Sequence, residues 1–532
     1  MTSSSSTIAE QIQTRRTFAI ISHPDAGKTT LTEKLLLYGG AIHLAGSVKA
    51  RRAARHATSD WMALEKERGI SVTSSVMQFH YAGCQVNLLD TPGHADFSED
   101  TYRTLIAADS AVMLLDNRRG VEERTRQLFD VCKMRRMPIF TFVNKCDRPG
   151  GDPLQLISDV EADLGIQVYP VTWPIFTSAG FTGVADRRRR EVILFDKAAD
   201  HGASLVEAER IPLDDPSLAD RLGPGALATL RDELDLIETA GHPWDEAKIR
   251  DGSLSPMYFG SALTNFGVAP FLEDFLAHAP PPLPREAEGR TVEPTDTDFT
   301  GFVFKIQANM DPKHRDRIAF VRICSGHFTS GLTAVIARNG KAIRIAQPQQ
   351  FLAQERSEID EAWPGDVIGV LDRGNLRVSD SLSLKGNVTF LGIPRFAPSL
   401  FARVVLRDPL RRKHLDTGLR QLTEEGAVQV FYQDSIAGPV PIVGAVGQLQ
   451  FDVLLHRLEH EYGVRATLEP LSFRVARWVR GPDEAIERLV EGRSRLRLYD
   501  TKGGSILLFE DEWALRHGME AGKELEFLEA AP

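Results

Sequence analysis

The chain has 532 residues, of which 42% are hydrophobic and 26% charged, and its formal net charge at pH 7 is −10. This length exceeds what one hydrophobic core usually holds, so we expect three domains. The negative balance argues against a protein that coats nucleic acid through overall attraction, and the lack of a run of about 18 apolar residues argues against a membrane span.

The first part of the chain alternates short apolar runs with helical segments. The N-terminus lacks the basic and apolar regions of a signal peptide, so we expect a disordered tail over 1–12 and a cytoplasmic protein. Residues 17–22 form an apolar run, and leucines at helical spacing follow within 29–38, which predicts strand, loop and helix. Buried parallel strands whose carboxyl ends face a ligand end in polar residues. The runs at 85–90, 110–116 and 138–144 have this pattern.

We therefore expect a multidomain α/β protein that begins with a P-loop domain over 13–284, doubly wound around a mostly parallel sheet. An insertion is expected in it at about 150–250, with a strand near 190–195 and one or two helices at 215–238. Several prolines and polar residues follow, and they predict a linker at 285–298.

The rest of the chain divides into two predicted domains. Short alternating runs separated by Ser-Gly, Asn-Gly and Pro-Gly turns predict a β-barrel domain over 299–392. The segment 393–532 combines strand-like runs at 402–406 and 428–431 with a helical pattern at 447–461, which predicts an α+β domain.

A phosphate-binding loop is predicted between the first strand and its helix, where residues 22–29 read Ser-His-Pro-Asp-Ala-Gly-Lys-Thr. Backbone N–H groups at a helix N-terminus form a concavity for phosphates, and Lys28 would add positive charge for the β and γ phosphates. Ser22 stands where the usual pattern has glycine, so a polar turn is the alternative for this segment alone. Thr29 is the expected Mg²⁺ ligand, and Thr30 can donate to the α phosphate.

A second box, Asp-Thr-Pro-Gly-His at 90–94, follows an apolar run. Asp90 would hold Mg²⁺ through a water molecule, and Gly93 would let its N–H approach the γ phosphate. Ordinary turn chemistry is the alternative. Glu-Arg-Gly-Ile-Ser at 67–71 lies where a mobile switch would bring a hydroxyl to Mg²⁺ only while the γ phosphate is present, so Ser71 would be that ligand. A charged turn before a strand is the alternative there.

The third box, Asn-Lys-Cys-Asp at 144–147, ends another apolar run. A carboxylate at Asp147 can accept both N1–H and the N2 amino group of guanine, and Lys145 would lie over the ring. A helix cap is the alternative for this box by itself. The turn Gly-Ser-Ala at 260–262 could present a backbone N–H to the guanine O6.

Each box is expected to bind a different part of one nucleotide, and the order of the boxes along the chain is compatible with the strand order of a parallel sheet. Together they predict a site for GTP or GDP with Mg²⁺. The expected metal ligands are Thr29, Ser71 and Asp90. The expected nucleotide-binding residues are Ser22, His23, Pro24, Asp25, Ala26, Gly27, Lys28, Thr29, Thr30, Asp90, Thr91, Pro92, Gly93, His94, Asn144, Lys145, Cys146, Asp147, Ser261 and Ala262.

Local basic clusters are candidates for RNA contacts, although a charge run is usually a solvated face. They are Arg51, Arg52 and Arg55; Arg187 to Arg190; Lys313, Arg315 and Arg317; Arg407, Arg411, Arg412 and Lys413; and Arg493, Arg495 and Arg497.

On these boxes the chain resembles the translational GTPases, and within them the bacterial peptide chain release factor three group. That family tolerates serine at the position of Ser22, its switch reads as residues 68–71 do, and its Asp-Thr-Pro-Gly-His box reads as residues 90–94 do. The likeness continues through the segments 97–103, 302–317, 425–431 and 444–451. Elongation factor G is similar in its first two domains but carries further domains that mimic a transfer RNA arm, for which little room remains after residue 475.

The resemblance implies a ribosome-stimulated GTPase of translation termination that promotes dissociation of class I release factors after peptide release. It assigns His94 to orienting the attacking water, and Ile70 with Pro24 to an apolar gate that restrains His94 until ribosomal RNA repositions it. Lys28 would neutralise charge on the phosphates, and Asp25 would help to hold a cation near them.

The expected partners are the ribosome, through its RNA and proteins, and class I release factors, without a membrane or DNA, and we expect a monomer. An elongation- or rescue-type GTPase is one alternative. A nucleotide-gated ribosome-binding module, in which hydrolysis is incidental, is another.

Overall fold

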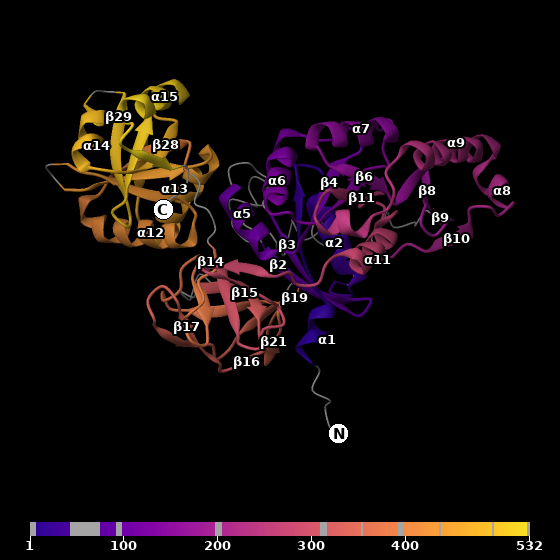
Figure 1. The fold of residues 1–532 in the computed structure, drawn as a ribbon, viewed down its shortest axis with the longest axis horizontal. Coiled ribbons are helices and arrows are strands. Elements are labelled where there is room, and N and C mark those ends of the chain that lie inside the picture. The colour runs from indigo at the N-terminus through magenta and orange to yellow at the C-terminus, as the bar shows by residue number, and fades with distance from the viewer. Residues whose placement is uncertain are drawn as a thin grey trace.

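The structure is a computed structural model, and it describes residues 7–42, 75–91, 98–196, 205–308, 317–352, 355–391, 397–435, 438–491 and 494–528. Figure 1 shows the chain as three bodies: an N-terminal body around a central sheet, a smaller body built of strands, and a C-terminal body that lies beside both.

The N-terminal body is built on a seven-stranded sheet in the order β2-β3-β1-β4-β5-β11-β6. Only the β2–β3 pair is antiparallel, and the other pairs are parallel. The strands are almost wholly buried, which explains their apolar sequences. Their bounds are β1 Arg15–Ser22, β2 Ser75–Tyr81, β3 Cys84–Asp90, β4 Ser110–Asp116, β5 Ile139–Asn144, β6 Gln167–Pro170 and β11 Leu254–Phe259.

Helices cover both faces of this sheet, as expected for a doubly wound domain. Leu35 and Phe275 belong to one core, on the side of α2 (Lys28–Tyr38) and α11 (Val268–His278). A separate core holds Leu105, Phe129 and Val160, from three helices on the other side. Those helices are α5 Ser98–Ala107, α6 Glu123–Met134 and α7 Pro153–Leu164. The short helix α10 (Glu246–Arg250) precedes β11.

The N-terminal tail is shorter than expected, because a helix, α1 (Ile8–Gln13), occupies part of the range 1–12. Thr7 and Glu10 form a capping box: the Thr7 hydroxyl accepts from the Glu10 N–H, and the Glu10 carboxylate accepts from the Thr7 N–H. Ile12 is buried. These caps and this burial give a six-residue helix enough support to form.

The insertion is also narrower than predicted. Helix α7 and strand β6 lie inside the range 150–250 but belong to the main α/β unit. Strand β6 pairs in parallel with β11, and Val160 of α7 packs in the core beside the main sheet. The inserted part is a four-stranded antiparallel sheet followed by two helices, and it projects from the N-terminal body in Figure 1. Its elements are β7 Thr172–Thr177, β8 Gly180–Asp186, β9 Glu191–Phe195, β10 Ala208–Pro212, α8 Leu218–Leu222 and α9 Pro224–Ala240.

The segment expected as a linker, 285–298, begins with an ordered hairpin of β12 (Arg285–Ala287) and β13 (Arg290–Val292). The Arg285 guanidinium is buried and donates to the carbonyls of Ile106 and Ala108 and to Asp109. The composition of the segment 285–298 predicted a linker, but the buried Arg285 side chain connects the hairpin to the C-terminal end of α5.

The second body is an eight-stranded sheet in the order β18-β17-β23-β14-β15-β22-β19-β20, with the short pair β16–β21 beside it. Its pairs are antiparallel and surround a core that includes Val303, Ile323 and Leu382. This agrees with the predicted barrel. The bounds are β14 Thr300–Ala308, β15 Arg317–Ser325, β16 Phe328–Thr329, β17 Thr333–Ile336, β18 Ala342–Arg344, β19 Gln349–Leu352, β20 Glu355–Glu358, β21 Glu361–Ala362, β22 Val367–Asp372 and β23 Ser381–Ser383.

The C-terminal body consists of two successive βαββαβ units that share one sheet, in the order β27-β24-β26-β25-β29-β30-β28-β31. The units join edge to edge where Phe431 pairs with Asp500 and Tyr432 with Tyr499. The first unit contains β24 Leu400–Leu406, the 3₁₀ turn η2 Pro409–Arg411, α12 Arg412–Glu425, β25 Gln429–Gln433, β26 Val440–Ala445, α13 Gln448–Tyr462 and β27 Ala466–Pro470. The second contains β28 Val475–Arg480, α14 Asp483–Val490, β29 Arg495–Asp500, β30 Ser505–Phe509, α15 Glu512–Ala521 and β31 Glu526–Leu528. The prediction of an α+β domain is therefore confirmed.

A buried ionic cluster joins the first two bodies. Asp109, which is fully buried, accepts from Arg285 at 2.7 Å and from Arg322 on β15 at 2.5 Å. Arg322 also donates to the Gly365 carbonyl, and that carbonyl accepts from the Thr17 hydroxyl on β1. A buried charge is tolerated only when it is paired and hydrogen-bonded, so this cluster requires the two bodies to stay together.

Candidate nucleotide-binding site

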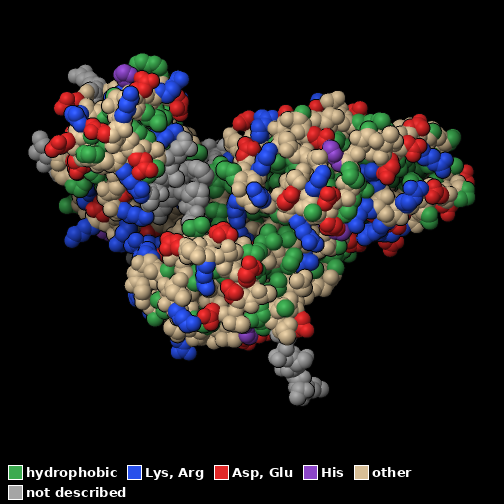
Figure 2. Space-filling model, in the orientation of Figure 1, with side chains coloured by type: hydrophobic (Ala, Val, Ile, Leu, Met, Phe, Trp, Pro, Cys, Tyr) green, Lys and Arg blue, Asp and Glu red, His purple; other side chains and the backbone are tan. Residues whose placement is uncertain are grey.

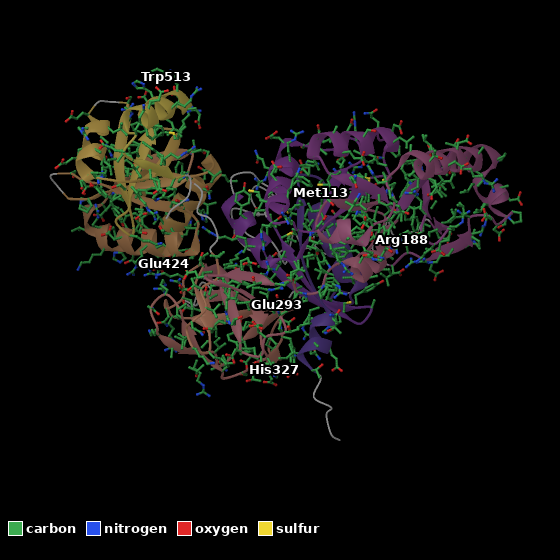
Figure 3. The ribbon with its side chains drawn as sticks, viewed as in Figure 1. Met113, Arg188, Glu293, His327, Glu424 and Trp513 are labelled. Atoms are coloured by element: carbon green, nitrogen blue, oxygen red, sulfur yellow. The ribbon has the colours of Figure 1, made fainter. Side chains whose placement is uncertain are left out.

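The predicted boxes meet at one edge of the central sheet. The strands β1, β3, β4, β5 and β11 are parallel, so their carboxyl ends lie at the same edge, and each is followed by polar or small residues. This edge is where doubly wound sheets bind ligands. Figure 3 places Met113, on β4, in the middle of this body.

The phosphate loop turns sharply into α2. Gly27 caps the helix with φ +99°, and a Cβ atom there would overlap the amide of Asn144. Only glycine combines this conformation with such a close approach. Lys28 begins the helix and forms an ion pair with Asp90 at the end of β3. The lysine of the first box and the carboxylate of the second therefore converge at one point.

Two threonines, Thr29 and Thr30, lie half-buried in the first turn of α2. A helix N-terminus carries unpaired N–H groups and a partial positive charge, and both favour phosphate. The Thr91 hydroxyl donates to the Ile20 carbonyl at 2.6 Å, which fixes the start of the second box against β1.

Asn144 connects the phosphate loop to the turn after β11. Its amide nitrogen donates to the Ala26 carbonyl at 2.8 Å, and its amide oxygen accepts from the Ala262 N–H at 2.8 Å. Asn144 is buried. Both ends of the side chain are thus used to hold two loops together.

Asp147 is held by the same turn, because the Ser261 hydroxyl donates to its carboxylate at 2.6 Å. The backbone N–H groups of Ser261 and Ala262 donate to the carbonyl of Phe266 and to Asn144. The contact of one of these N–H groups with the guanine O6 stays a prediction for the nucleotide-bound protein. In the structure, the turn contributes to the site by orienting Asp147.

Lys145 is fixed by a residue that the sequence boxes do not contain. Its ammonium donates to Asp116, at the end of β4, at 2.7 Å and to the Asp25 carbonyl at 2.5 Å. Burial raises the pKa of Asp116, but hydrogen bonds from Lys145 and from the backbone of Arg118 and Arg119 outweigh it, so the pKa lies below its ordinary value. The sequence signal was an apolar run ending in aspartate, the same signal that identified Asp90.

Other residues of the boxes have different surroundings. The His23 side chain is buried, with Nδ1 3.2 Å from the Glu122 carboxylate, and so lies against the start of α6. The Cys146 thiol donates to the Val143 carbonyl at 3.6 Å, and burial raises its pKa. Ser22 is also buried, whereas Pro24 and Asp25 are exposed. Ile70, Ser71, Pro92, Gly93 and His94 lie outside the described residues.

Several basic clusters are engaged within the chain. In the 187–190 cluster, Arg187 pairs with Glu238 and Arg188 with Asp274, with the Arg188 guanidinium 3.9 Å from the centre of the Trp244 ring. Figure 3 labels Arg188 near the insertion. Arg317 pairs with Glu424, and Arg497 with Asp483 and Glu487. Lys313, Arg315, Arg51, Arg52, Arg55 and Arg493 are outside the described residues.

No helix within the described ranges has both the length and the apolar character needed to cross a bilayer.

Comparison with known families divides the chain into three matching segments. Residues 13–281 match the elongation factor Tu GTP-binding domain, residues 298–385 match elongation factor G domain 2, and residues 390–519 match the class II release factor RF3 C-terminal domain. The order agrees with the three bodies of the structure.

Curated relatives match over nearly the whole chain. The chain is 55% identical over 520 residues to the peptide chain release factor 3 of Symbiobacterium thermophilum, covering 98% of both chains. It is 52% identical over 525 residues to that of Acaryochloris marina, covering 99% of this chain and 97% of the relative.

The fold also resembles a solved structure. The crystal structure of ttk003000868 from Thermus thermophilus matches with a TM-score of 0.68 at 23% identity, over 93% of this chain and 72% of that one. At this identity the likeness concerns the fold alone.

The meeting of the predicted boxes at a parallel sheet edge and the sequence similarity to one group of relatives over nearly the full length point to the same conclusion. This chain belongs to the peptide chain release factor 3 family of translational GTPases, which bind and hydrolyse GTP and act with the ribosome in translation termination.

Proposed function

We propose that this chain, loaded with GTP, promotes dissociation of a class I release factor from the ribosome after the polypeptide has been released, and leaves the ribosome after hydrolysis. The observation that carries the proposal is the full-length similarity to peptide chain release factor 3, which includes the C-terminal segment 390–519. We also propose that it acts as a cytoplasmic monomer.

Mg²⁺ is proposed as the cofactor, and the oxygen donors at the site fit it. The Thr29 hydroxyl and the buried Asp90 carboxylate are hard oxygen ligands of the kind that Mg²⁺ takes together with phosphates and water. When bound, Mg²⁺ would neutralise charge on the phosphates.

Residues of the chain would bind the phosphates and the base and position the attacking water. Lys28 would leave Asp90 to neutralise the β and γ phosphates, while backbone N–H groups of the loop cradle them. Asp147, oriented by Ser261, would accept from the guanine N1–H and N2 amino group. We propose that His94 orients the attacking water, and that Ile70 with Pro24 restrains His94 until the ribosome repositions it. Asp25 would help to hold a cation near the phosphates.

The test is the dissociation rate of a fluorescently labelled class I release factor from a post-termination ribosome complex. We expect added protein with GTP to accelerate dissociation, and repeated turnover to require hydrolysis. If dissociation is not accelerated while ribosomes still stimulate hydrolysis, an elongation- or rescue-type role is favoured instead.

The role of His94 is tested by His94→Ala, with His80→Ala as the control because His80 is an exposed histidine on β2. We expect His94→Ala to bind GTP almost normally and to lose ribosome-stimulated turnover by about 10²-fold or more. If ribosome-stimulated hydrolysis is unchanged in His94→Ala, His94 does not orient the attacking water. If the class I release factor dissociates without GTP hydrolysis, a nucleotide-gated binding module is favoured.

A further inference from the structure

A cavity lies where the three bodies meet, and its lining includes none of the predicted nucleotide-binding residues. Its volume is about 520 Å³, within the range of small-ligand sites. It is bounded by Arg103 on α5, by barrel residues 377–379, by α12 and β25, and by the turn at 500–502 of the second C-terminal unit. Figure 3 labels Glu424, one of its lining residues, at the junction of the C-terminal body with the barrel.

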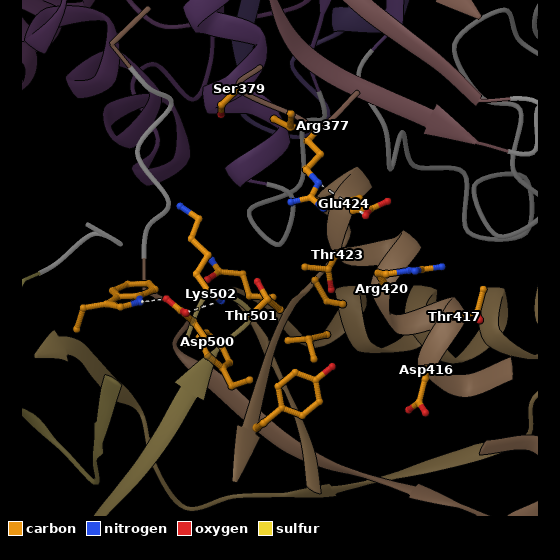
Figure 4. A pocket seen from close by; sticks show the side chains of 18 of the residues that line it. Arg377, Ser379, Asp416, Thr417, Arg420, Thr423, Glu424, Asp500, Thr501 and Lys502 are labelled. Carbon is orange, nitrogen blue, oxygen red and sulfur yellow. Dashed lines mark hydrogen bonds and ion pairs between the residues drawn. The ribbon is translucent and has the colours of Figure 1, made fainter. Parts of the chain in front are cut away.

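The wall of this cavity carries basic side chains without strong partners. Lys502 and Arg420 are exposed, and no ion pair or side-chain hydrogen bond of either is found within the described ranges. Arg377 has one ion pair there, with Nε 4.0 Å from Glu424. In Figure 4 Arg377 reaches down from the barrel side beside Glu424 and Lys502 reaches up from the C-terminal body, and both residues line the same cavity. Like charges that share a space repel each other, and an anion between them would remove the repulsion.

The carboxylates beside these cations are already engaged. Asp500 accepts from the Trp478 indole N–H at 3.1 Å and from the backbone N–H groups of Lys502 and Gly504 at 2.8 Å each. Glu424 accepts from Arg317 at 2.8 Å. The third carboxylate of the lining, Asp416, pairs with Arg412. These contacts leave the carboxylates less available to neutralise Arg420 and Lys502, while Arg377 keeps its long ion pair with Glu424. Figure 2 shows Lys and Arg side chains gathered over the junction of the C-terminal body with the barrel.

The wall of the cavity also carries aromatic, aliphatic and hydroxyl groups. It includes the half-buried ring of Tyr432, the side chains of Val428 and Val430, and the hydroxyl of Thr423. The Thr423 hydroxyl donates to the Leu419 carbonyl, so its oxygen remains able to accept. An aromatic ring beside paired cations is the combination that binds a base together with its phosphate.

We propose that this cavity binds a phosphate-bearing nucleotide unit, with the phosphate between Arg377 and Lys502 and the base against Tyr432. The unit could belong to a free nucleotide or to a strand of RNA. An acidic peptide would match the cations, but Asp and Glu side chains have no aromatic ring to stack on Tyr432, and this difference favours the nucleotide unit. The proposal does not depend on the release of class I factors.

The site would also link the three bodies. Its walls come from α5, the barrel and both C-terminal units, and Arg103 on α5 donates to the Gly426 carbonyl after α12 at 3.3 Å. A ligand held at this junction would favour the arrangement of the bodies in which these walls are close together.

The test uses the full chain with its guanine site saturated with GDP and three probes measured by fluorescence anisotropy. A 5′-labelled RNA hexamer is the direct probe, ADP is a competitor that the guanine site should reject, and a labelled hexaglutamate peptide represents an acidic partner. The variants are Arg377→Ala/Lys502→Ala and Tyr432→Leu. Lys523→Ala removes an exposed lysine outside the cavity and serves as the control.

We expect the double variant to weaken hexamer binding at least tenfold and to reduce its salt slope by about two, and Lys523→Ala to change neither. Tyr432→Leu should weaken binding severalfold through lost stacking. Displacement by ADP would identify a free nucleotide as the source, and failure of ADP to displace the hexamer would identify RNA.

The proposal is overturned if the hexamer and ADP bind the wild type no better than the double variant, or if hexaglutamate binds more tightly through the same two cations. Unchanged GDP affinity in every variant checks that the protein is folded, since the guanine site uses none of the substituted residues.

Discussion

The contact between Asp116 and Lys145 makes the position of Lys145, the lysine predicted to cover the guanine ring, depend on a residue outside the sequence boxes. Asp116→Asn keeps the shape of the side chain but removes its charge, so Lys145 keeps only the Asp25 carbonyl as a strong acceptor. A hydrogen bond to a charged group contributes about 1.5–3 kcal/mol. The Lys145 side chain is 23% exposed, so solvent screening reduces this to about 1–2 kcal/mol. GDP affinity should therefore fall about 5- to 30-fold.

A double-mutant cycle measures this effect directly. GDP affinity is determined by isothermal titration calorimetry for Asp116→Asn, Lys145→Met and the combined variant. If Asp116 acts by holding Lys145, the two substitutions should be strongly non-additive, because the second removes a contact that the first has already broken. Additive losses, or an unchanged affinity in Asp116→Asn, would refute the reasoning.

The same contact has a defined pH dependence. The pKa of Asp116 is lowered in the folded protein, so its contribution to stability is fully present above the ordinary carboxyl pKa. It is lost only as the pH falls through the lowered value. Between pH 6 and 8, Asp116 should therefore cause no change in GDP affinity; a titration of wild-type affinity with a step in that interval would contradict the assignment.

Other substitutions test the base contact and the joints between the bodies. Asp147→Asn should shift preference from guanine toward xanthine nucleotides, because its amide can donate to the xanthine O2; competition binding measures this, and a continued preference for GTP would contradict it. Asp109→Ala should cost about 3–5 kcal/mol by leaving two buried guanidinium groups without a counter-charge, seen as a lower urea midpoint. Gly426→Ala should loosen the contact with Arg103, because the added Cβ atom would overlap the Arg103 guanidinium. Amide hydrogen exchange around residue 426 should therefore increase. Gly463→Ala, also at positive φ but facing open space, is the control.

The strands that are buried on both faces of the central sheet could be predicted from the sequence. The runs that became β1, β3, β4 and β5 are apolar because they lie in the middle of a covered parallel sheet, and their polar ends mark the ligand edge. Lys28 and Asp90 could be assigned to one site for this reason. Asp116 ended the same kind of run, but its partner Lys145 lies 29 positions away, and no local pattern connects the two.

The errors arose where a tertiary contact outweighs local composition. The hairpin at 285–292 has the composition of a spacer, yet Arg285 is buried against Asp109, 176 positions earlier. Strand β6 has only four residues and is defined by its pairing with β11. The helix α1 could have been predicted, since Thr7 and Glu10 have the spacing of a capping box.

The cluster around Asp109 has a consequence for how the chain is made. Arg322 follows Asp109 by 213 positions, and bacterial ribosomes add about 5–20 residues per second. Asp109 is thus synthesised roughly 10–40 s before its second arginine. Until Arg285 is added, 176 positions after Asp109, the nascent N-terminal body holds a carboxylate that burial would penalise. The pairing with both arginines is complete only once the barrel strand that carries Arg322 has emerged.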